Sequence, residues 1–233
     1  MHVRSPLQVE SRAIFTSRSG GKSGAPYGSR NLALHVGDDP ELVRQNREDL
    51  AHELSIASER LFFMEQNHGV EIQIVDEASD HRKIRTCDAL VTSTPQTALA
   101  VLVADCAPLL IRGERASAAV HVGWRGLFSG IVEKVLERFA EERFSASIGA
   151  TICGECYRIG EDLLSQAQER GFVTGAQTLD IPRSILKILH EQSGNRLIAA
   201  QWNGTCTFES NEHFSYRREG RTGRQAGVVI HGS

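Results

Sequence analysis

Three side chains that bind transition metals occur where apolar runs of the sequence end. His68 lies in a predicted turn before a strand, Cys106 interrupts a long apolar run, and His121 closes another run directly before a Gly-rich turn. Catalytic groups of α/β proteins usually lie at such strand ends. Two histidines and one cysteine suit a catalytic zinc site, which keeps a fourth position open to water. The sequence therefore predicts a metal centre made of these three residues.

The same residues also have interpretations without a metal. Each one alone is more often a core histidine or a buried structural thiol. Cys106 could instead be the nucleophile of a cysteine hydrolase, with His121 as its base. The presence of His68 as a third ligand favours the metal over this dyad. Asp105, next to Cys106, is predicted either to carry a proton during catalysis or to serve only as a hydrogen-bonding anchor.

Several guanidinium groups could bind an anionic substrate. Arg125 directly follows Trp124, and Arg217 and Arg218 lie together in the segment 214–224. Arginine binds phosphate with two parallel hydrogen bonds, and an indole ring stacks on a base or sugar. Arg125, with Arg217 or Arg218, could therefore bind a phosphate or a carboxylate, and Trp124 could stack on the base or sugar of a substrate. The alternative is that these arginines are ordinary solvated surface residues.

Two further motifs give weaker signals. Cys153 and Cys156 form a CxxC pair, as in redox dithiols and in halves of structural zinc sites, but the sequence has no second CxxC. A packed or incidental pair is the favoured interpretation. Residues 20–23 (Gly-Gly-Lys-Ser) resemble part of a phosphate-binding loop, yet Thr16 stands where that motif needs glycine. Residues 17–29 are therefore predicted to form a surface loop near the substrate.

Strand-like and helix-like stretches are interleaved along the chain, which predicts an α/β fold. The apolar run at residues 89–111 has the pattern of strands buried on both faces. We expect strands at residues 13–16, 71–75, 116–122, 147–153, 197–201 and 226–230, and helices beginning at 38–40 and over 129–143, 161–170 and 182–192. The predicted fold class is α/β (α+β), a single-domain layered sandwich over residues 1–233 with a mixed β-sheet flanked by helices.

Composition narrows the possible partners. A net charge of −3 over 233 residues argues against nucleic acid as the main partner. No apolar run approaches the ~18 residues needed to span a bilayer. Residues 1–10 lack an apolar secretory segment, so a cytoplasmic protein without membrane association is predicted. Five cysteines without an export signal argue against a disulfide framework. The sequence does not indicate an oligomeric state.

Six segments of the chain together resemble the YfiH-like family, which carries the older name laccase-domain or multicopper polyphenol oxidoreductase. They are FTSRSGG (15–21), NLALHVGDDP (31–40), QNHG (66–69), ADCAP (104–108), HVGWRG (121–126) and FSYRREGRTGR (214–224). They occur in the family's order and extend over nearly the whole chain. Residues 149–150 are Gly-Ala where family members commonly have Gly-Pro, so part of the pocket wall is expected to differ.

The resemblance implies a zinc-dependent purine nucleoside enzyme whose metal ligands are the same two histidines and cysteine. It also implies that Arg125, Asn31 and Arg18 lie near the substrate. The reactions of the family are phosphorolysis of adenosine, inosine, guanosine and methylthioadenosine, and deamination of adenosine. The expected partners are therefore a purine nucleoside and phosphate, with Zn²⁺ as the cofactor and copper as an alternative.

Two other functions stay open. The older family name suggests a copper-dependent polyphenol oxidase, and blue-copper sites also use two histidines and a cysteine. Nine histidines without any His-x-His pair argue against a multicopper cluster. A role in editing or binding a cell-wall precursor is the remaining alternative.

Overall fold

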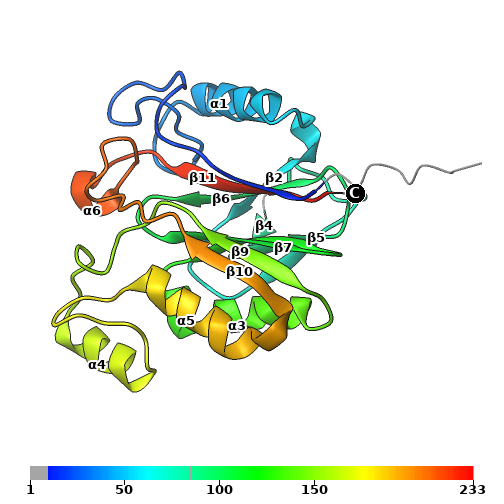
Figure 1. Cartoon of the computed structure of the whole chain (residues 1–233). Coiled ribbons are helices and arrows are strands. Elements are labelled where there is room, and N and C mark those ends of the chain that lie inside the picture. The colour runs from blue at the N-terminus through cyan, green and yellow to red at the C-terminus, as the bar shows by residue number, and fades with distance from the viewer. Residues whose placement is uncertain (1–9, 84, 233) are drawn as a thin grey trace, which may run out of the picture.

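Two mixed β-sheets packed face to face form the centre of the molecule (Figure 1). The computed structural model describes residues 10–83 and 85–232. The strands are β1 (Arg12–Phe15), β2 (Leu61–Glu65), β3 (Ile72–Val75), β4 (Arg85–Thr86), β5 (Ala89–Thr92), β6 (Ala98–Val103), β7 (Ala107–Gly113), β8 (Ser117–Val122), β9 (Phe144–Ile148), β10 (Leu197–Trp202) and β11 (Gln225–Ile230). The first sheet has the order β1-β11-β6-β2-β4 and the second β10-β9-β7-β8-β5-β3.

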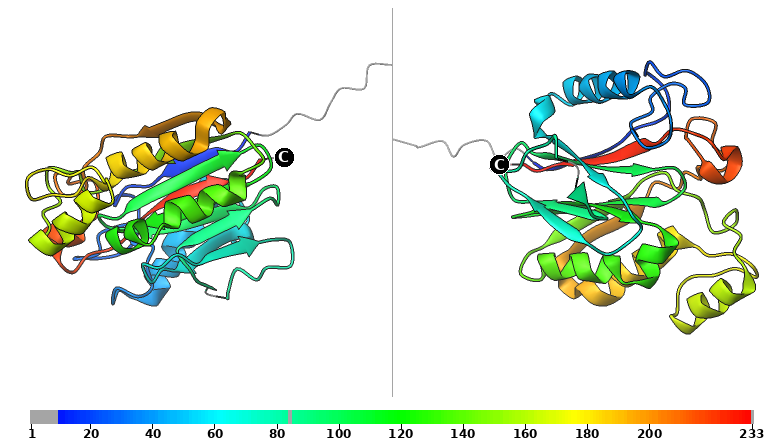
Figure 2. Two further views of the ribbon diagram at one scale, coloured as in Figure 1. Left: turned by 90° about the horizontal axis from the view of Figure 1, so that it is seen from below. Right: turned by 180° about the vertical axis from the view of Figure 1, so that it is seen from behind.

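Helices cover the outer face of each sheet (Figure 2). They are α1 (Pro40–Glu53), α2 (Trp124–Phe128), α3 (Ile131–Leu136), α4 (Glu161–Glu169), α5 (Ile181–Ser193) and α6 (Tyr216–Glu219), with 3-10 turns at Ser58–Arg60, Glu137–Phe139 and Gly194–Arg196. Apolar residues of α1 pack on the first sheet, and those of α2, α3 and α5 pack on the second. The predicted α/β layered sandwich is thus confirmed, with two mixed sheets where one was expected.

The apolar run at residues 89–111 consists of three strands that alternate between the sheets. β5 and β7 belong to the second sheet and β6 to the first, so the chain crosses between the sheets twice. The crossings coincide with the two polar interruptions of the run, at residues 93–97 and 104–106. The second crossing carries Asp105 and Cys106, so both lie where the two sheets meet at one end.

Two predicted elements differ from those observed. The helix expected at residues 129–143 is shorter than predicted: α2 ends before it, at Phe128, and only α3 and the 3-10 turn that follows lie within it. Gly130 between α2 and α3 has a φ of +83°, a left-handed conformation that glycine tolerates and that interrupts a helix. The strand expected at residues 147–153 is β9, which ends at Ile148. Beyond it, Thr151 forms an isolated bridge with Cys206 instead of continuing the sheet.

Residues 1–9 and 233 lie outside the described part of the chain. The expectation of no secretory segment and the outer limits of the predicted domain rest on these residues. Among the described residues, no helix combines the length and the apolar character that crossing a bilayer requires.

Asn46 on α1 anchors the Gly/Ser-rich loop at residues 17–30. Its Nδ2 donates to Oγ of Ser23 (3.0 Å) and to the carbonyl of Asn31 (2.9 Å). Its Oδ1 accepts a hydrogen bond from the backbone amide of Lys22 (2.8 Å). The side chain is 1% exposed, so none of these partners can be replaced freely by water. The predicted surface loop is therefore fixed against α1.

Replacing Asn46 by alanine leaves buried donors and acceptors of the loop without partners. We expect the free energy of unfolding of Asn46→Ala to fall by about 1–3 kcal/mol, measured by chemical denaturation. Cleavage within residues 17–30 by a protease should also become faster. Glu48→Ala, an exposed change on the same helix, is the control. Equal unfolding free energies for the two variants would contradict this role.

Candidate metal centre

Strand pairing around β8 brings the predicted ligands together. β8 lies between β7 and β5 and is antiparallel to both. His121 of β8 pairs with Pro108 of β7, and its backbone amide donates to the carbonyl of Asp88, directly before β5 (2.8 Å). Cys106 directly precedes β7 and so lies beside the end of β8. Antiparallel pairing places opposed side chains next to each other, so residues distant in sequence meet at this end of the second sheet.

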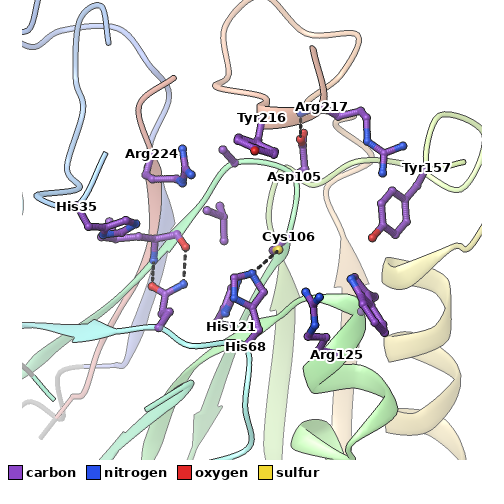
Figure 3. Close-up of a pocket in the computed structure, with 15 residues that line it drawn as sticks. His35, His68, Asp105, Cys106, His121, Arg125, Tyr157, Tyr216, Arg217 and Arg224 are labelled. Carbon is purple, nitrogen blue, oxygen red and sulfur yellow. Dashed lines mark hydrogen bonds between the residues drawn. The ribbon is translucent and has the colours of Figure 1, made fainter. Parts of the chain in front are cut away.

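The two histidines and the cysteine converge on one point (Figure 3). His68, Cys106 and His121 each offer a donor atom, and these atoms lie within 4.8 Å of one another. Nε2 of His68 is 4.0 Å from Sγ of Cys106, and the two imidazole ring centroids are 4.7 Å apart. His121 is buried, Cys106 is half-buried and His68 is exposed, so one side of the cluster is open to solvent.

Asp88 orders this cluster, and sequence analysis missed it. Its Oδ1 lies 2.7 Å from Nδ1 of His121, and both side chains are buried. The carboxylate also accepts hydrogen bonds from the backbone amides of His68 (3.0 Å) and Gly69 (2.7 Å). Because Asp88 occupies Nδ1 of His121, Nε2 of this histidine is the atom left to bind a metal. The same buried carboxylate also holds the loop that carries His68. The available signal was an acidic residue directly before a fully buried strand.

The charges around Cys106 favour its thiolate form. Burial alone would raise the pKa of Cys106, but the cationic His121 and hydrogen bonds from both histidines lower this pKa to about 6. Burial alone would lower the pKa of His121, but the thiolate and the Asp88 carboxylate raise it to about 9. The metal-free pair is therefore a thiolate and an imidazolium near neutral pH, and a bound cation replaces the imidazolium proton.

The donor set fits a transition metal ion. A thiolate and two neutral imidazoles are ligands that both zinc and copper accept. Three protein ligands leave one coordination position for water or substrate. Gly123 permits the close approach of the ligands, because a Cβ at this position would lie 3.0 Å from Cδ2 of His68 and 3.1 Å from Sγ of Cys106. The residues thus supply both the donors and the space for an ion.

The cluster lines a cavity of about 510 Å³, a volume typical of small-molecule sites. The structure brings together here seven of the predicted site residues: His68, Asp105, Cys106, His121, Trp124, Arg125 and Arg217. The lining also includes His35, Gln66, Leu102, Val103, Ala104, Tyr157, Tyr216 and Arg224. Five of these additional residues lie within the six segments that carry the family resemblance, but sequence reasoning gave them no individual role: His35, Gln66, Ala104, Tyr216 and Arg224.

Three arginines surround the cavity (Figure 3). The guanidinium of Arg125 stacks on Trp124 (4.4 Å to the ring centroid), and that of Arg217 stacks on Tyr157 (4.9 Å). Arg224 approaches from the opposite side. Among the described residues, the Arg125 side chain has no hydrogen-bond partner, so its donors are free for a ligand. The concentration of positive charge favours an anionic ligand.

Arg218 differs from Arg217, although both belong to the same motif. Its guanidinium donates to the carbonyls of Thr207 (2.6 Å), Ser210 (2.9 Å) and His213 (2.7 Å), and it forms an ion pair with Glu219. These bonds occupy its donors and hold a loop together. Of Arg217 and Arg218, only Arg217 lines the cavity, so the geometry favours Arg217 as the partner of an anionic ligand.

Asp105 holds two loops through its carboxylate. Oδ1 accepts from Oγ1 of Thr207 (2.6 Å), and Oδ2 accepts from the backbone amide of Arg217 (2.6 Å). Its φ of +92° turns the chain sharply at the crossing between the sheets. This geometry matches the anchor interpretation of Asp105. A role in proton transfer stays a prediction.

Arg18 and Asn31 support the cavity from behind. Asn31 is fully buried, and its Oδ1 accepts from the backbone amide of Arg224 (3.0 Å). Nη1 of Arg18 lies 2.7 Å from Oε1 of Glu219, the last residue of α6. Neither residue is part of the cavity lining. Each positions a segment that lines the cavity, and direct contact of either with a substrate stays a prediction.

Removing the carboxylate of Asp88 should weaken metal binding. Asp88→Asn keeps the size of the side chain but no longer favours the required orientation and basicity of His121, so we expect metal affinity to fall roughly 10–100-fold. Competition with a chromophoric chelator measures this affinity. Asp162→Asn, an exposed change on α4, should leave the affinity unaltered. An Asp88→Asn protein that binds metal as tightly as the natural chain would refute the proposed orienting role.

The ionised side chain of Glu219 should stabilise the folded protein in a way that is lost in acid. Burial would raise its pKa, but hydrogen bonds from Thr222, Arg218 and Arg18 outweigh burial and lower the pKa below the ordinary value of 4.5. The stabilisation is therefore complete above about pH 4.5 and is lost as the pH falls through the lower folded-state pKa. Because the pairs are partly solvated, we expect Glu219→Gln to cost no more than about 1 kcal/mol near neutral pH. Denaturant titrations should show this difference shrinking below about pH 4.

Comparison with known proteins finds relatives over nearly the whole chain. Residues 12–232 match the family model described as multi-copper polyphenol oxidoreductase laccase. A purine nucleoside phosphorylase of Corynebacterium glutamicum is 40% identical over 94% of this chain and 93% of its own. A purine nucleoside phosphorylase of Streptomyces coelicolor is 37% identical over 92% of this chain and 93% of its own.

Solved structures agree in fold over nearly the full length. A Neisseria meningitidis protein superposes with a TM-score of 0.82 at 28% identity, covering 96% of this chain and 98% of its own. YlmD from Geobacillus stearothermophilus gives a TM-score of 0.83 at 26% identity, covering 95% and 92%. The chain therefore belongs to the YfiH-like family whose model is described as multi-copper polyphenol oxidoreductase laccase, as the six sequence segments indicated.

Proposed function

We propose that this chain is a metal-dependent purine nucleoside phosphorylase with zinc as its metal. The observation that carries the proposal is the presence, in one cavity, of the His68, Cys106 and His121 ligand cluster and of the free guanidinium of Arg125. The Corynebacterium and Streptomyces relatives named purine nucleoside phosphorylase support the same reaction.

Zinc is the metal that the ligand types favour. Catalytic zinc is held by three imidazole, thiolate or carboxylate ligands with a fourth position open, and two imidazoles and one thiolate fit this pattern. When bound, zinc would supply a Lewis acid for negative charge that develops beside these ligands. The residues of the chain would position the ligands: Asp88 orients His121, and Gly123 leaves room between His68 and Cys106. Copper accepts similar ligands, so the metal content of the natural protein must be measured.

In phosphorolysis, a phosphate oxygen bonds to C1′ of the ribose while the bond from C1′ to N9 breaks. The bonding pair leaves with the purine, and the products are the base and ribose 1-phosphate. Arg125, Arg217 and Arg224 would bind the phosphate, neutralise its charge and orient the attacking oxygen. Trp124 and Tyr157 would offer aromatic faces to the nucleoside. Adenosine, inosine, guanosine and methylthioadenosine all contain this bond and are the proposed substrates.

Deamination of adenosine is a proposed second activity of the same cavity. Water adds at C6, and ammonia leaves with the proton it needs. The Asp105 carboxylate already holds two loops by accepting hydrogen bonds from Thr207 and from the Arg217 amide, although each oxygen keeps a lone pair that could take up that proton. We therefore propose that Asp105 mainly positions Cys106 and the loop of Arg217, and that deamination is the slower reaction.

A cysteine hydrolase is the competing proposal, because one observation favours it. Cys106, His121 and Asp88 form a nucleophile, a base and an orienting carboxylate in series, and the pKa of the thiol is lowered to about 6. His68 separates the two proposals, since a hydrolase of this kind does not need it and a metal site does. Loss of bound metal in His68→Ala, together with loss of activity, would exclude the hydrolase.

Removing Arg125 should weaken phosphate binding with little effect on the metal centre. We expect Arg125→Ala to raise the KM for phosphate about tenfold or more, because one charged hydrogen-bonding partner of phosphate is lost. Release of adenine or hypoxanthine from adenosine or inosine, with and without phosphate, is followed by chromatography, and bound metal is measured by elemental analysis. Arg138→Ala, an exposed arginine in the Glu137–Phe139 turn, is the matched control.

Cys106→Ala provides the second arm of the experiment. It should lose metal from the centre and phosphorolysis together. A purified natural chain that holds zinc and converts none of the four nucleosides with phosphate present would overturn the proposed function. Retention of full activity after complete removal of transition metals would overturn the role of the metal.

A further inference from the structure

A second group of metal-binding side chains lies outside the centre described above. Cys153, Cys156, Cys206 and Glu209 each offer a donor atom, and these atoms lie within 4.8 Å of one another. Cys153 and Cys156 come from the loop after β9, and the other two come from the loop after β10. We propose that these four residues form a second, structural zinc site that joins the two loops.

Backbone pairing explains why the two loops meet. Thr151 and Cys206 form a parallel bridge: the amide of Thr151 donates to the carbonyl of Thr205 (3.2 Å), and the amide of Thr207 donates to the carbonyl of Thr151 (3.1 Å). This pairing carries Cys206 to the start of the CxxC segment. The amide of Cys153 then lies 3.4 Å from Sγ of Cys206 and donates to it.

The CxxC segment itself forms a tight turn with a fixed position. The amides of Cys156 and Tyr157 both donate to the carbonyl of Cys153 (3.2 and 2.9 Å), which brings the two thiols to the same side. Gly154 lies so close to the start of α5 that a Cβ would be 2.5 Å from Cβ of Asp180. The turn is therefore packed in place, independently of any ion.

The donor set matches zinc. Structural zinc sites are four-coordinate and rich in thiolates, and a carboxylate oxygen is an accepted ligand. Sγ of Cys206 accepts a hydrogen bond from the backbone amide of Cys153 (3.4 Å), and such contacts orient metal ligands. Oε1 of Glu209 lies 3.5 Å from Sγ of Cys156. Three thiols and one carboxylate therefore surround a space without a positive side chain among them.

A disulfide accounts for this cluster less well than a cation does. Any disulfide uses two of the three thiols, and it leaves the third thiol and the Glu209 carboxylate beside an uncharged group. A divalent cation takes all four donors at once. The CxxC pair was interpreted from the sequence as incidental because its partners, Cys206 and Glu209, lie about fifty residues away and form no CxxC of their own.

The second site would brace one wall of the cavity. Tyr157, which follows Cys156, lines the cavity. Thr207, which follows Cys206, donates to the Asp105 carboxylate next to Cys106 (2.6 Å). An ion that fixes the two loops thereby fixes the side of the cavity that faces Arg125. This inference does not depend on the identity of the substrate.

Zinc stoichiometry tests the proposal directly. The full chain is produced with zinc supplied, purified in the presence of a thiol reductant, and analysed for metal content and intact mass. We expect about two zinc ions per natural chain, one in Cys156→Ser, one in Cys106→Ala and none in the double variant. Glu155→Gln, an exposed change between the two cysteines of the turn, is the matched control and should keep two.

Cobalt substitution separates the two sites by their ligands. Three of the four proposed thiolate ligands belong to the second site, so Cys106→Ala should keep most of the thiolate-to-cobalt charge-transfer absorption and Cys156→Ser should lose most of it. If Cys156→Ser does not fold, Glu209→Gln replaces it, because Glu209 is exposed, and should release one zinc to a chelator faster than Glu155→Gln does.

Three results would overturn the proposal. The first is a content of one zinc ion per natural chain. The second is an unchanged zinc content in Cys156→Ser or, where Glu209→Gln replaces it, an unchanged rate of zinc release. The third is an intact mass that shows a disulfide within the cluster under reducing conditions. If Cys106→Ala loses zinc while Cys156→Ser keeps its full content, the metal centre is supported and only the second site is refuted, so the two proposals fail separately.

Discussion

The buried carboxylate of Asp88 is the interaction on which the rest of the site depends. An ionised group without solvent contact is costly unless charge and hydrogen bonds compensate it. Asp88 obtains this compensation from the imidazole of His121 and from backbone amides of the loop that carries His68. The start of β5, the end of β8 and the loop after β2 are therefore held by one group. The geometry of the candidate ligands and the local fold are therefore coupled at this point.

Sequence reasoning selected the three residues of the candidate metal centre because side chains that bind metals stand where apolar runs end, which is a local signal. It identified the α/β class for the same reason. It missed Asp88, Cys206 and Glu209 because their significance arises only from partners that are distant in sequence. The late start of the helix predicted at residues 129–143 rests on a single backbone angle, that of Gly130, which an apolar repeat does not register.

The motif residues fall into two kinds that a sequence pattern does not distinguish. Arg125 and Arg217 present guanidinium groups to the cavity. Arg18 and Arg218 are of the same residue type, yet their donors hold loops and the end of α6. Burial and the supply of nearby carbonyl acceptors decide which arginine is a scaffold and which remains available. A motif therefore marks a site more reliably than it assigns a role within that site.

The position of His121 within β8 has an evolutionary consequence. Side chains alternate between the faces of a strand, so a slip of one residue would turn this imidazole toward the helical layer and away from its partners. Insertions in β8 are thus excluded while the centre is in use. The loops after β9 and β10 are restricted only at the bridge of Thr151 with Cys206, at the bond from Thr207 to Asp105 and at the four proposed zinc ligands, so their other parts can change in length. Lineages can therefore remodel what the cavity admits while inheriting its reactive centre unchanged.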